Sequence, residues 1–431
     1  MDYKELYRRK LVSVEEALSR IPDGAALTTS LCAIEPAALL SRLHTVADAG
    51  KRFRIYSALN MRDYPYLQDT AYADRITVDC LFAMGPDRKG HRAGMVNIVP
   101  GHLHSGIHRW AEVYQPNVFL GCVSAMDAHG YCRFSLSNMH EQEMVRRSDL
   151  VICEVNPNMP IVGGETEIHI SQIDYLVESE AEIPVLPKGP ITEEEETIGR
   201  YVASLVNDGD TIQLGIGGIP DAVANALMDK HDLGVHTEMM TSSMADLVEA
   251  GVVTNRKKNF MTGKMIATFA LGSQKLYDLM DRNPAVWIMR GSYVNAPHIV
   301  AKNDNMVSIN TAVEVDLSGQ ICSETIGTLH YSGSGGQNDT AEGAIHSKGG
   351  RSIIALRSTA KGGTVSTINA IHTPGAVVTL SRNNIDYVVT EYGIAPLRGR
   401  SVRERVRNLT AIAHPDFRET LRKDAEKLLL W

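Results

Sequence analysis

The strongest constraint on the fold is a repeated alternation between short β-branched runs and longer amphipathic segments. The runs are 118–123, 150–155, 353–356, 377–380 and 387–390. Each is apolar and bounded by turn-forming or polar residues, which is typical of strands buried on both faces of a parallel sheet. Amphipathic segments such as 13–20, 192–205 and 402–412 predict helices between the strands. The alternation therefore predicts an open α/β architecture with largely parallel sheets.

A proline-rich segment, AEIPVLPKGPITEEEE at 181–196, predicts a boundary between two domains, 1–188 and 189–431. Its run of glutamates favours the start of a helix, because acidic side chains stabilise the first turn. Residues 15–40 and 206–227 each contain a helix, an Asp-Gly pair, a strand, a small-residue loop, a proline and a second helix. This internal similarity predicts two similar open α/β/α domains.

Charge and composition argue against several classes of partner. The net charge is −8 and no block is rich in Lys or Arg, so nucleic acid is not an expected partner. The arginines between Arg398 and Arg407 are interpreted as a solvated helix face, with an anion site as the alternative. No secretory signal is visible, and no apolar stretch approaches the ~20 residues of a membrane span. We therefore expect a soluble, cytoplasmic protein with no membrane partner.

The cysteines are scattered along the chain without a CxxC pair, and several lie inside apolar runs. They are Cys32, Cys80, Cys122, Cys132, Cys153 and Cys322. Such positions suit reduced, buried thiols better than disulfides or zinc ligands. Because no other constellation of His, Cys and acidic residues suggests a metal site, we expect no metal.

A glycine-rich loop, LGIGGIP at 214–220, follows a predicted strand and opens a helix. Gly215, Gly217 and Gly218 would let a ligand approach the backbone, and the helix N-terminus would offer N–H groups to an anion. The alternative is a dinucleotide site, but the pattern is GxGGxP, not GxGxxG. Pro220 at the third glycine position argues against the close helix packing of that fingerprint.

Three polar features further along the chain have both a functional and a structural interpretation. Glu238 stands beside apolar residues at the end of a predicted strand. It is interpreted either as a functional carboxylate or as an exposed residue at the strand end. The turn SGSGGQND at 332–339 can form an oxyanion cradle or a flexible loop. Asn295 can donate to an oxyanion or shape a turn, and His236 is interpreted as a structural hydrogen bonder. These residues alone leave the choice open.

Together, long ordered segments of the chain resemble the class I coenzyme A transferases, in the branch that contains acetyl-CoA hydrolases and 4-hydroxybutyrate or butyrate–acetate CoA-transferases. The segments include EVNPNMP at 154–160, LGIGGIPDAV at 214–223, HTEMM at 236–240, SGSGGQND at 332–339 and TEYGIAPLRGRS at 390–401. They run nearly from end to end of the chain. The resemblance implies two α/β domains with the active site in the cleft between them, and a homodimer or homotetramer.

The resemblance also implies a role for individual residues. Glu238 matches the catalytic glutamate of the family, and Asn295 with Gly335 and Gly336 matches its oxyanion donors. The matches for the acyl, thioester and CoA-binding positions are Gly215, Gly217, Gly218, Lys361 and Gly393. No tightly bound cofactor is implied, because the coenzyme A thioester is a substrate.

The implied reaction is reversible transfer of CoA from an acyl-CoA to a small carboxylic acid of the acetate, butyrate or 4-hydroxybutyrate class. It would run by a ping-pong mechanism through a glutamyl-CoA thioester. The alternatives are an acyl-CoA hydrolase of the same family, a transferase for a dicarboxylate such as itaconate or succinate, a non-catalytic CoA sensor, and an NAD-linked oxidoreductase. Arg290 could pair the second carboxylate of a dicarboxylate, or form a surface salt bridge.

The sequence departs from the family pattern beside the expected acyl pocket. Thr241-Ser242-Ser243 stands where relatives usually have Ser-Asp-Gly, and Thr340 stands where a Phe is usual. Arg290-Gly291 stands where many relatives carry a Pro. These differences leave the chemistry intact and the identity of the acid open.

Overall fold

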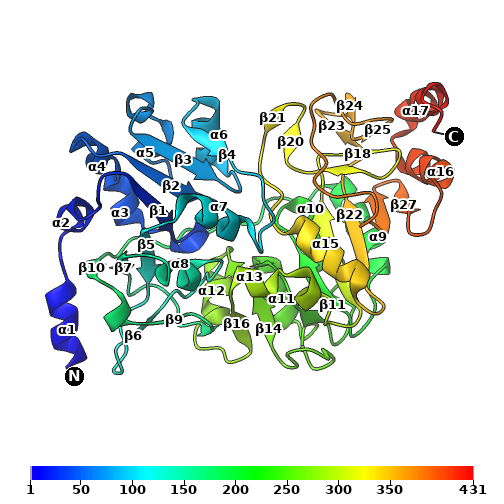
Figure 1. Cartoon of the computed structure of the whole chain (residues 1–431). Helices are drawn as coiled ribbons and strands as arrows, with labels where there is room; N and C mark the ends of the chain where they lie inside the picture. The colour runs from blue at the N-terminus through cyan, green and yellow to red at the C-terminus, as the bar shows by residue number, and fades with distance from the viewer. Residues whose placement is uncertain (1, 431) are drawn as a thin grey trace. The chain divides into compact units, whose positions relative to one another are not determined.

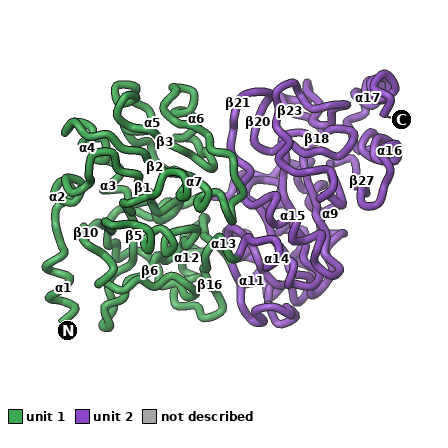
Figure 2. Tube along the Cα trace, in the orientation of Figure 1, with its two compact units in different colours: residues 1–186, 267–293 green, residues 187–266, 294–431 purple. Residues whose placement is uncertain are grey.

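The structure is a computed structural model that describes residues 2–430 (Figure 1). The chain divides into two compact units, each made of two stretches of sequence (Figure 2). Unit 1 contains Met1–Leu186 and Ala267–Tyr293, and unit 2 contains Pro187–Ile266 and Val294–Trp431. Each unit is described separately below.

Within the described range, unit 1 is built on a seven-stranded sheet whose neighbouring strands are all parallel. In spatial order the strands are β10 (Tyr175–Glu178), β7 (Leu150–Val155), β5 (Val118–Val123), β1 (Ala25–Thr29), β2 (Phe53–Ser57), β3 (Ile76–Cys80) and β4 (Val96–Ile98). The predicted strands at 118–123 and 150–155 are confirmed as β5 and β7. The main core packs on this sheet and includes Leu27, Ile55 and Leu120, which are all fully buried.

Helices and short strands complete unit 1. The helices are α1 (Tyr3–Lys10), α2 (Val14–Ser19), α3 (Ala37–Arg42), α4 (His44–Asp48), α5 (Pro65–Gln68), α6 (Gly85–Arg92), α7 (Gly106–Tyr114), α8 (Glu141–Val145) and α12 (Gln274–Met280). The short strands are β6 (Tyr131–Arg133), β8 (Gly163–Gly164), β9 (Glu167–His169), β15 (Phe269–Ala270) and β16 (Val286–Ile288). β14 (Met265–Ala267) and α13 (Gly291–Val294) lie where the chain passes between the units.

Unit 2 has, in its described residues, a six-stranded sheet. In order its strands are β12 (Gly234–Val235), β11 (Thr211–Leu214), β17 (Met306–Thr311), β22 (Arg351–Ala355), β26 (Tyr387–Thr390) and β27 (Gly393–Pro396). All neighbours are parallel except β27, which returns antiparallel to β26. The two units therefore both contain the parallel α/β sheets that the sequence predicted.

The helices of unit 2 follow the predicted alternation. They are α9 (Glu193–Ser204), α10 (Gly218–Ala226), α11 (Ser242–Glu249), α14 (Pro297–Val300), α15 (Gln337–His346), α16 (Val402–Ile412) and α17 (Pro415–Lys427). α9 begins at a capping box in which Thr192 and Glu195 bond each other's backbone N–H groups, and α16 begins at an equivalent box. These caps explain why the helix starts could be predicted closely.

Short strands also lie beyond the carboxyl ends of the main strands in unit 2. They are β13 (Met239–Met240), β18 (Glu314–Asp316), β19 (Ile321–Cys322), β20 (Thr325–Ile326), β21 (Leu329–His330), β23 (Thr359–Ala360), β24 (Val365–Ser366) and β25 (Ile368–Asn369). The predicted strand at 377–380 is wrong, because only Leu380 forms a single bridge, to Ile321. The run is not buried on both faces, since Val378 is 47% exposed.

Three global features bear on the predicted partners. Among residues 2–430, no helix is both long and apolar enough to cross a membrane. The same residues contain no cluster of three or more His, Cys, Asp or Glu side chains that could hold a metal ion. The cysteine side chains of the described chain are buried and unpaired.

Candidate functional site

The residues predicted to act together lie at the carboxyl edge of the unit 2 sheet. β11 and β12 are parallel neighbours, and Ile212 pairs with Val235. The segments that follow them, the loop containing Gly215 and the segment containing Glu238, therefore leave the sheet at the same edge. In open α/β sheets this edge is where ligands bind.

Glu238, Asn295 and Gly336 meet at this edge, although they come from distant parts of the sequence. The Asn295 side-chain amide donates to Glu238 Oε2 over 3.3 Å, and the Gly336 backbone N–H donates to the same carboxylate. A methyl group at Gly336 would overlap both Glu238 and Asn295, so only glycine fits. Gly335 has a φ of +52°, in the left-handed region that glycine favours. The structure thus assembles a carboxylate with two hydrogen-bond donors.

The electrostatic setting of Glu238 is that of a poorly solvated carboxylate. Gly336 is the N-cap of α15, so the carboxylate lies at the positive end of a helix dipole. Burial and, to a smaller extent, the nearby Asp339 charge raise the pKa of Glu238 to about 7, while the hydrogen bonds from Gly336 and Asn295 oppose this shift. The side chain is closely surrounded but keeps some solvent exposure. A carboxylate in this state can act as a nucleophile or a base near neutral pH.

Two buried basic groups lie in or against the segment that leads from β12 to Glu238. His236 is 1% exposed, and its Nε2 lies 2.9 Å from the Val294 carbonyl. The Lys258 ammonium donates to the carbonyls of Val235 and Lys264, at 2.9 and 2.7 Å. Burial lowers the pKa of Lys258 to about 7. Sequence reasoning interpreted His236 correctly as a hydrogen bonder and missed Lys258.

The glycine-rich loop is shaped by acidic neighbours. Gly217 is the N-cap of α10 with a φ of +112°, and a methyl group at Gly218 would overlap the Glu195 carboxylate. Asp221 in the first turn of α10 accepts a hydrogen bond from Ser243. Two carboxylates thus already occupy the start of α10. This arrangement disfavours a phosphate there and argues against the dinucleotide alternative.

Lys361 and Gly393 lie on loops that follow β22 and β26 at the same sheet edge. Ser358 joins these loops by bonding both oxygens of Glu391, with Oγ at 2.5 Å and N at 2.9 Å. Lys361 is exposed in the hairpin between β23 and β24, and Gly393 has a φ of +135° at the turn into β27. No hydrogen bond or ion pair between described residues joins Lys361 or Gly393 to Glu238. The structure therefore brings them to the same edge but not into contact with the carboxylate.

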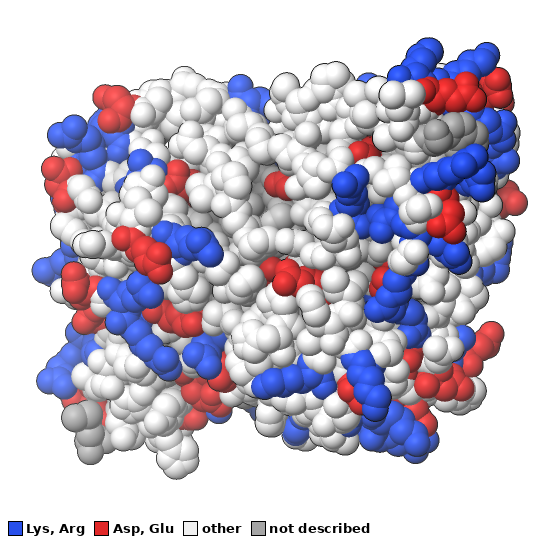
Figure 3. Space-filling model, turned by 45° about the vertical axis from the view of Figure 1, so that its right-hand side comes forward, with Lys and Arg blue, Asp and Glu red and all other residues white. Residues whose placement is uncertain are grey.

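The arginines with alternative interpretations form internal ion pairs or backbone contacts. In unit 1, Arg290 bonds Glu165 through Nε at 2.9 Å and Nη2 at 3.3 Å, as the salt-bridge interpretation predicted. In unit 2, Arg398 pairs with Asp386, and Arg405 donates to backbone carbonyls. Figure 3 shows acidic side chains mixed among the basic ones on the visible face. These pairings support a solvated, charge-balanced surface.

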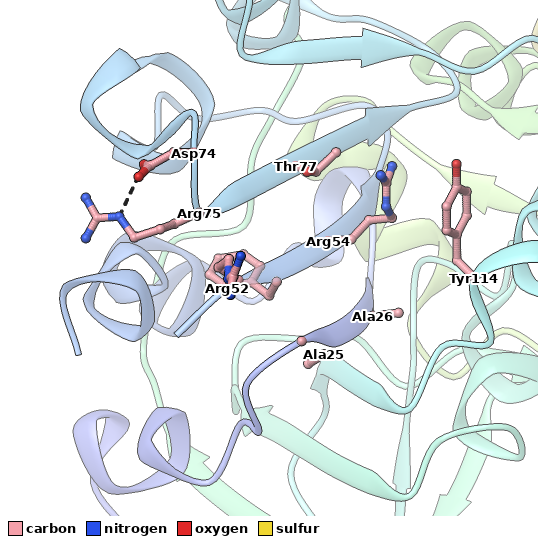
Figure 4. Close-up of a pocket in the computed structure, with 10 residues that line it drawn as sticks. Ala25, Ala26, Arg52, Arg54, Asp74, Arg75, Thr77 and Tyr114 are labelled. Atoms are coloured by element: carbon pink, nitrogen blue, oxygen red, sulfur yellow. Dashed lines mark hydrogen bonds and ion pairs between the residues drawn. The ribbon is translucent and has the colours of Figure 1, made fainter. Parts of the chain in front are cut away.

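Unit 1 also has a shallow hollow of about 250 Å³ at the amino ends of β1, β2 and β3 (Figure 4). Its arginines are largely engaged within the protein. Arg54 bonds Asp79 at 2.6 Å and lies 4.2 Å from the centre of the Tyr114 ring. Arg75 pairs with Asp74. The hollow contains no residue predicted to act in the reaction and lies at the edge opposite the one that binds ligands in such sheets.

Family models and related proteins assign the chain to the same family. The model of the acetyl-CoA hydrolase/transferase N-terminal domain matches residues 1–187, and that of the C-terminal domain matches residues 272–425. The chain is 41% identical to succinyl-CoA:cyclohexane-1-carboxylate CoA transferase of Geobacter metallireducens, over 99% of this chain and 97% of that protein. It is 42% identical to 4-hydroxybutyrate coenzyme A transferase of Clostridium kluyveri, over 99% and 100%.

A solved structure gives the same result. RipA from Yersinia pestis matches with a TM-score of 0.95 and 38% identity, covering 100% of both chains. The sequence-based prediction of the family and of the enzyme class, a CoA-transferase, is thereby confirmed. The chain belongs to the acetyl-CoA hydrolase/transferase family.

Proposed function

We propose that this enzyme transfers CoA reversibly from an acyl-CoA to a small carboxylic acid of the acetate, butyrate or 4-hydroxybutyrate class, with Glu238 as its covalent nucleophile. The observation that carries the proposal is the half-buried carboxylate of Glu238, held by Asn295 and Gly336 at the start of α15. The substrate class is supported by full-length relatives, such as the 4-hydroxybutyrate transferase, that share about two fifths of the sequence.

The reaction proceeds in balanced steps. The ionised Glu238 carboxylate attacks the acyl carbonyl, which breaks the C–S bond, releases CoA thiolate and leaves a mixed anhydride. The thiolate then attacks the Glu238 carbonyl carbon, forming a glutamyl-CoA thioester and expelling the first acid as its carboxylate. The incoming carboxylate reverses these two steps. Splitting one difficult exchange into easier ones is covalent catalysis with ping-pong kinetics.

Each attack creates a tetrahedral oxyanion, which needs donors that are already in position. The Asn295 amide and the Gly336 N–H are suited to this task because they already touch a Glu238 oxygen. Gly335 supports the task through its left-handed backbone, which precedes the N-cap. Preorganised donors of this kind are each worth ~3 kcal/mol in the transition state.

The substrate would lie along the carboxyl edge of the unit 2 sheet. The loop with Gly215, Gly217 and Gly218 would line the acyl and thioester groups, while Lys361 and the segment at Gly393 would contact CoA. Contacts remote from the thioester can be used to press the reacting atoms together. We further propose that CoA is a substrate and not a resident cofactor, and that the enzyme works as a cytoplasmic homodimer or homotetramer.

The decisive experiment is to trap the covalent intermediate. The protein is incubated with an acyl-CoA, reduced with borohydride and digested, and the peptides are mapped by mass. We expect modification at Glu238 in the native protein and none in Glu238→Ala. An unmodified Glu238, together with CoA exchange by the alanine variant, would refute the proposal. CoA release that needs no acceptor acid would instead identify a hydrolase.

A further inference from the structure

A buried imidazole connects the segment that carries Glu238, between β12 and β13, to the segment that carries Asn295. His236 is two residues before Glu238, and Val294 is directly before Asn295. The Nε2 of His236 lies 2.9 Å from the Val294 carbonyl oxygen, although 58 residues separate the two. This long-range contact lies two residues before Glu238 and one residue before Asn295, the two partners of the 3.3 Å bond.

The surroundings of His236 hold its ring in one place. Its backbone N–H donates to Ile212 of β11, so the residue continues the pairing of the central sheet. The preceding carbonyl, that of Val235, is bonded by the buried Lys258 ammonium. The His236 side chain is therefore anchored on a fixed backbone, with little freedom to turn away from Val294.

The protonation state of the ring follows from its partners. A carbonyl oxygen only accepts, so Nε2 must carry the proton. Burial and then the Lys258 charge lower the pKa of His236 to about 3, which keeps the ring neutral. Within residues 2–430, Nδ1 has no hydrogen-bond partner, so the ring's one hydrogen bond to the protein is the bond to Val294.

We infer that His236 is a positioning residue, which sets the distance between Asn295 and Glu238 through its bond to the Val294 carbonyl. The inference rests on the proposed function for its kinetic consequence but not for its geometry. Loss of the bond frees Val294, and Asn295 moves away from the carboxylate. A misplacement of about 1 Å in an active site can cost about 10²-fold in rate.

Two amide variants separate positioning from simple structural support. In His236→Gln the amide nitrogen reaches the place of Nε2 and can still donate to Val294. In His236→Asn the amide is too short to reach. We expect His236→Gln to retain kcat within about threefold and His236→Asn to lose about 10- to 10²-fold in kcat with KM for acyl-CoA unchanged. Thermal unfolding of both variants controls for folding.

Two further measurements complete the test. Because His236 acts through Asn295, adding His236→Asn to Asn295→Ala should slow the enzyme by less than about twofold. Crystal structures of the variants give the distance between Asn295 and Glu238 without any reaction. They therefore test the inference even if the proposed CoA transfer proves wrong. We expect about 3.3 Å in His236→Gln and more than about 4 Å in His236→Asn. An unchanged distance in His236→Asn, or equal kcat losses in the two amide variants, would overturn the inference.

Discussion

Each unit holds a glutamate that accepts backbone N–H bonds and has a raised pKa, but only the glutamate of unit 2 keeps access to solvent. Glu154 in unit 1 and Glu238 in unit 2 both accept backbone N–H bonds at a helix start, from Leu39 in α3 and from Gly336 before α15. Burial raises the pKa of each to about 7. Glu154, however, is 1% exposed, whereas Glu238 keeps contact with solvent. The raised pKa of each glutamate therefore reports its burial. Solvent access is what distinguishes the nucleophile that we propose, Glu238, from the structural acid Glu154.

The hydrogen-bond donors to the two carboxylates also differ. Leu39 lies in the first turn of α3, and its backbone nitrogen lies 2.7 Å from Glu154 Oε1. Glu238 instead receives donors from a glycine with no side chain and from an amide on another segment. Donors on such segments can remain in place while a substrate carbon joins the carboxylate. The comparison suggests four tests, ordered by the size of the expected effect on activity.

The largest effect is expected from removing the nucleophile that we propose, Glu238. Glu238→Gln and Glu238→Ala should lower CoA exchange by about 10⁴-fold or more, because both remove the carboxylate on which we propose that the thioester forms. Glu154→Gln, the matched change in unit 1, should leave exchange within about twofold. Steady-state exchange between acetyl-CoA and butyrate measures both. Comparable losses in the two variants would remove the distinction between the carboxylates.

The second effect concerns the Asn295 donor. Asn295→Ala should lower kcat by about 10²-fold, equivalent to ~3 kcal/mol, because one oxyanion donor is lost. The KM for acyl-CoA should change little, since the donor acts mainly in the transition state. Asn303→Ala removes another fully buried amide of unit 2 and is the control. If the control loses as much activity as Asn295→Ala, the loss reflects folding and not chemistry.

The third effect is on the pH profile. Glu238 must be ionised to attack, so with a pKa of about 7 the value of kcat/KM should fall about tenfold per pH unit below neutrality and level off above it. The Asp339 charge raises that pKa, so Asp339→Asn should move the midpoint to lower pH. Asp316→Asn, which changes a buried acid bonded to Ser318 and Gln320, should not move it. If the pH midpoint of kcat/KM were unchanged in Asp339→Asn, the fall in kcat/KM at low pH could not be assigned to Glu238.

The sequence predicted the parallel sheets because short apolar runs report burial on both faces. It failed at 377–380, where an equally apolar run follows Pro374 and Gly375 and stays partly exposed. Local composition does not show which apolar runs reach the core. The meeting of Glu238 with Asn295 could not come from local pattern either, since 57 residues separate them. That pairing was expected only from the family resemblance.

Lys258 was missed for a related reason. It stands in the polar stretch Asn255-Arg256-Lys257-Lys258-Asn259, which has the composition of an exposed loop. In the structure Lys258 is 3% exposed, because its stem packs beside Gly234 and its ammonium donates hydrogen bonds to two backbone carbonyls. Glycine at 234, where a methyl would overlap the lysine stem, was the available signal. Such a signal is readable only once the two segments are known to be neighbours.

The smallest effect on activity is expected at Glu154, where stability is the quantity that changes. The folded pKa of about 7 lies above the ordinary value of 4.5, so folding binds a proton. Stability from this group is complete below about pH 4.5 and is lost as the pH rises toward 7. Glu154→Gln cannot ionise but still accepts from Leu39, so its urea midpoint should fall less than that of the native protein over this range. Glu154→Leu leaves the buried N–H without an acceptor and should be about 1–3 kcal/mol less stable than Glu154→Gln at every pH.

Glu238→Gln should flatten the stability profile between the same pH values, because the Glu238 pKa is raised in the same direction. The two Gln variants would then share a change in the pH dependence of unfolding while differing about 10⁴-fold in CoA exchange. If Glu154→Gln instead lost activity at an unchanged urea midpoint, solvent access would not be what separates the two carboxylates. The unit 1 carboxylate would then have to take part in the reaction.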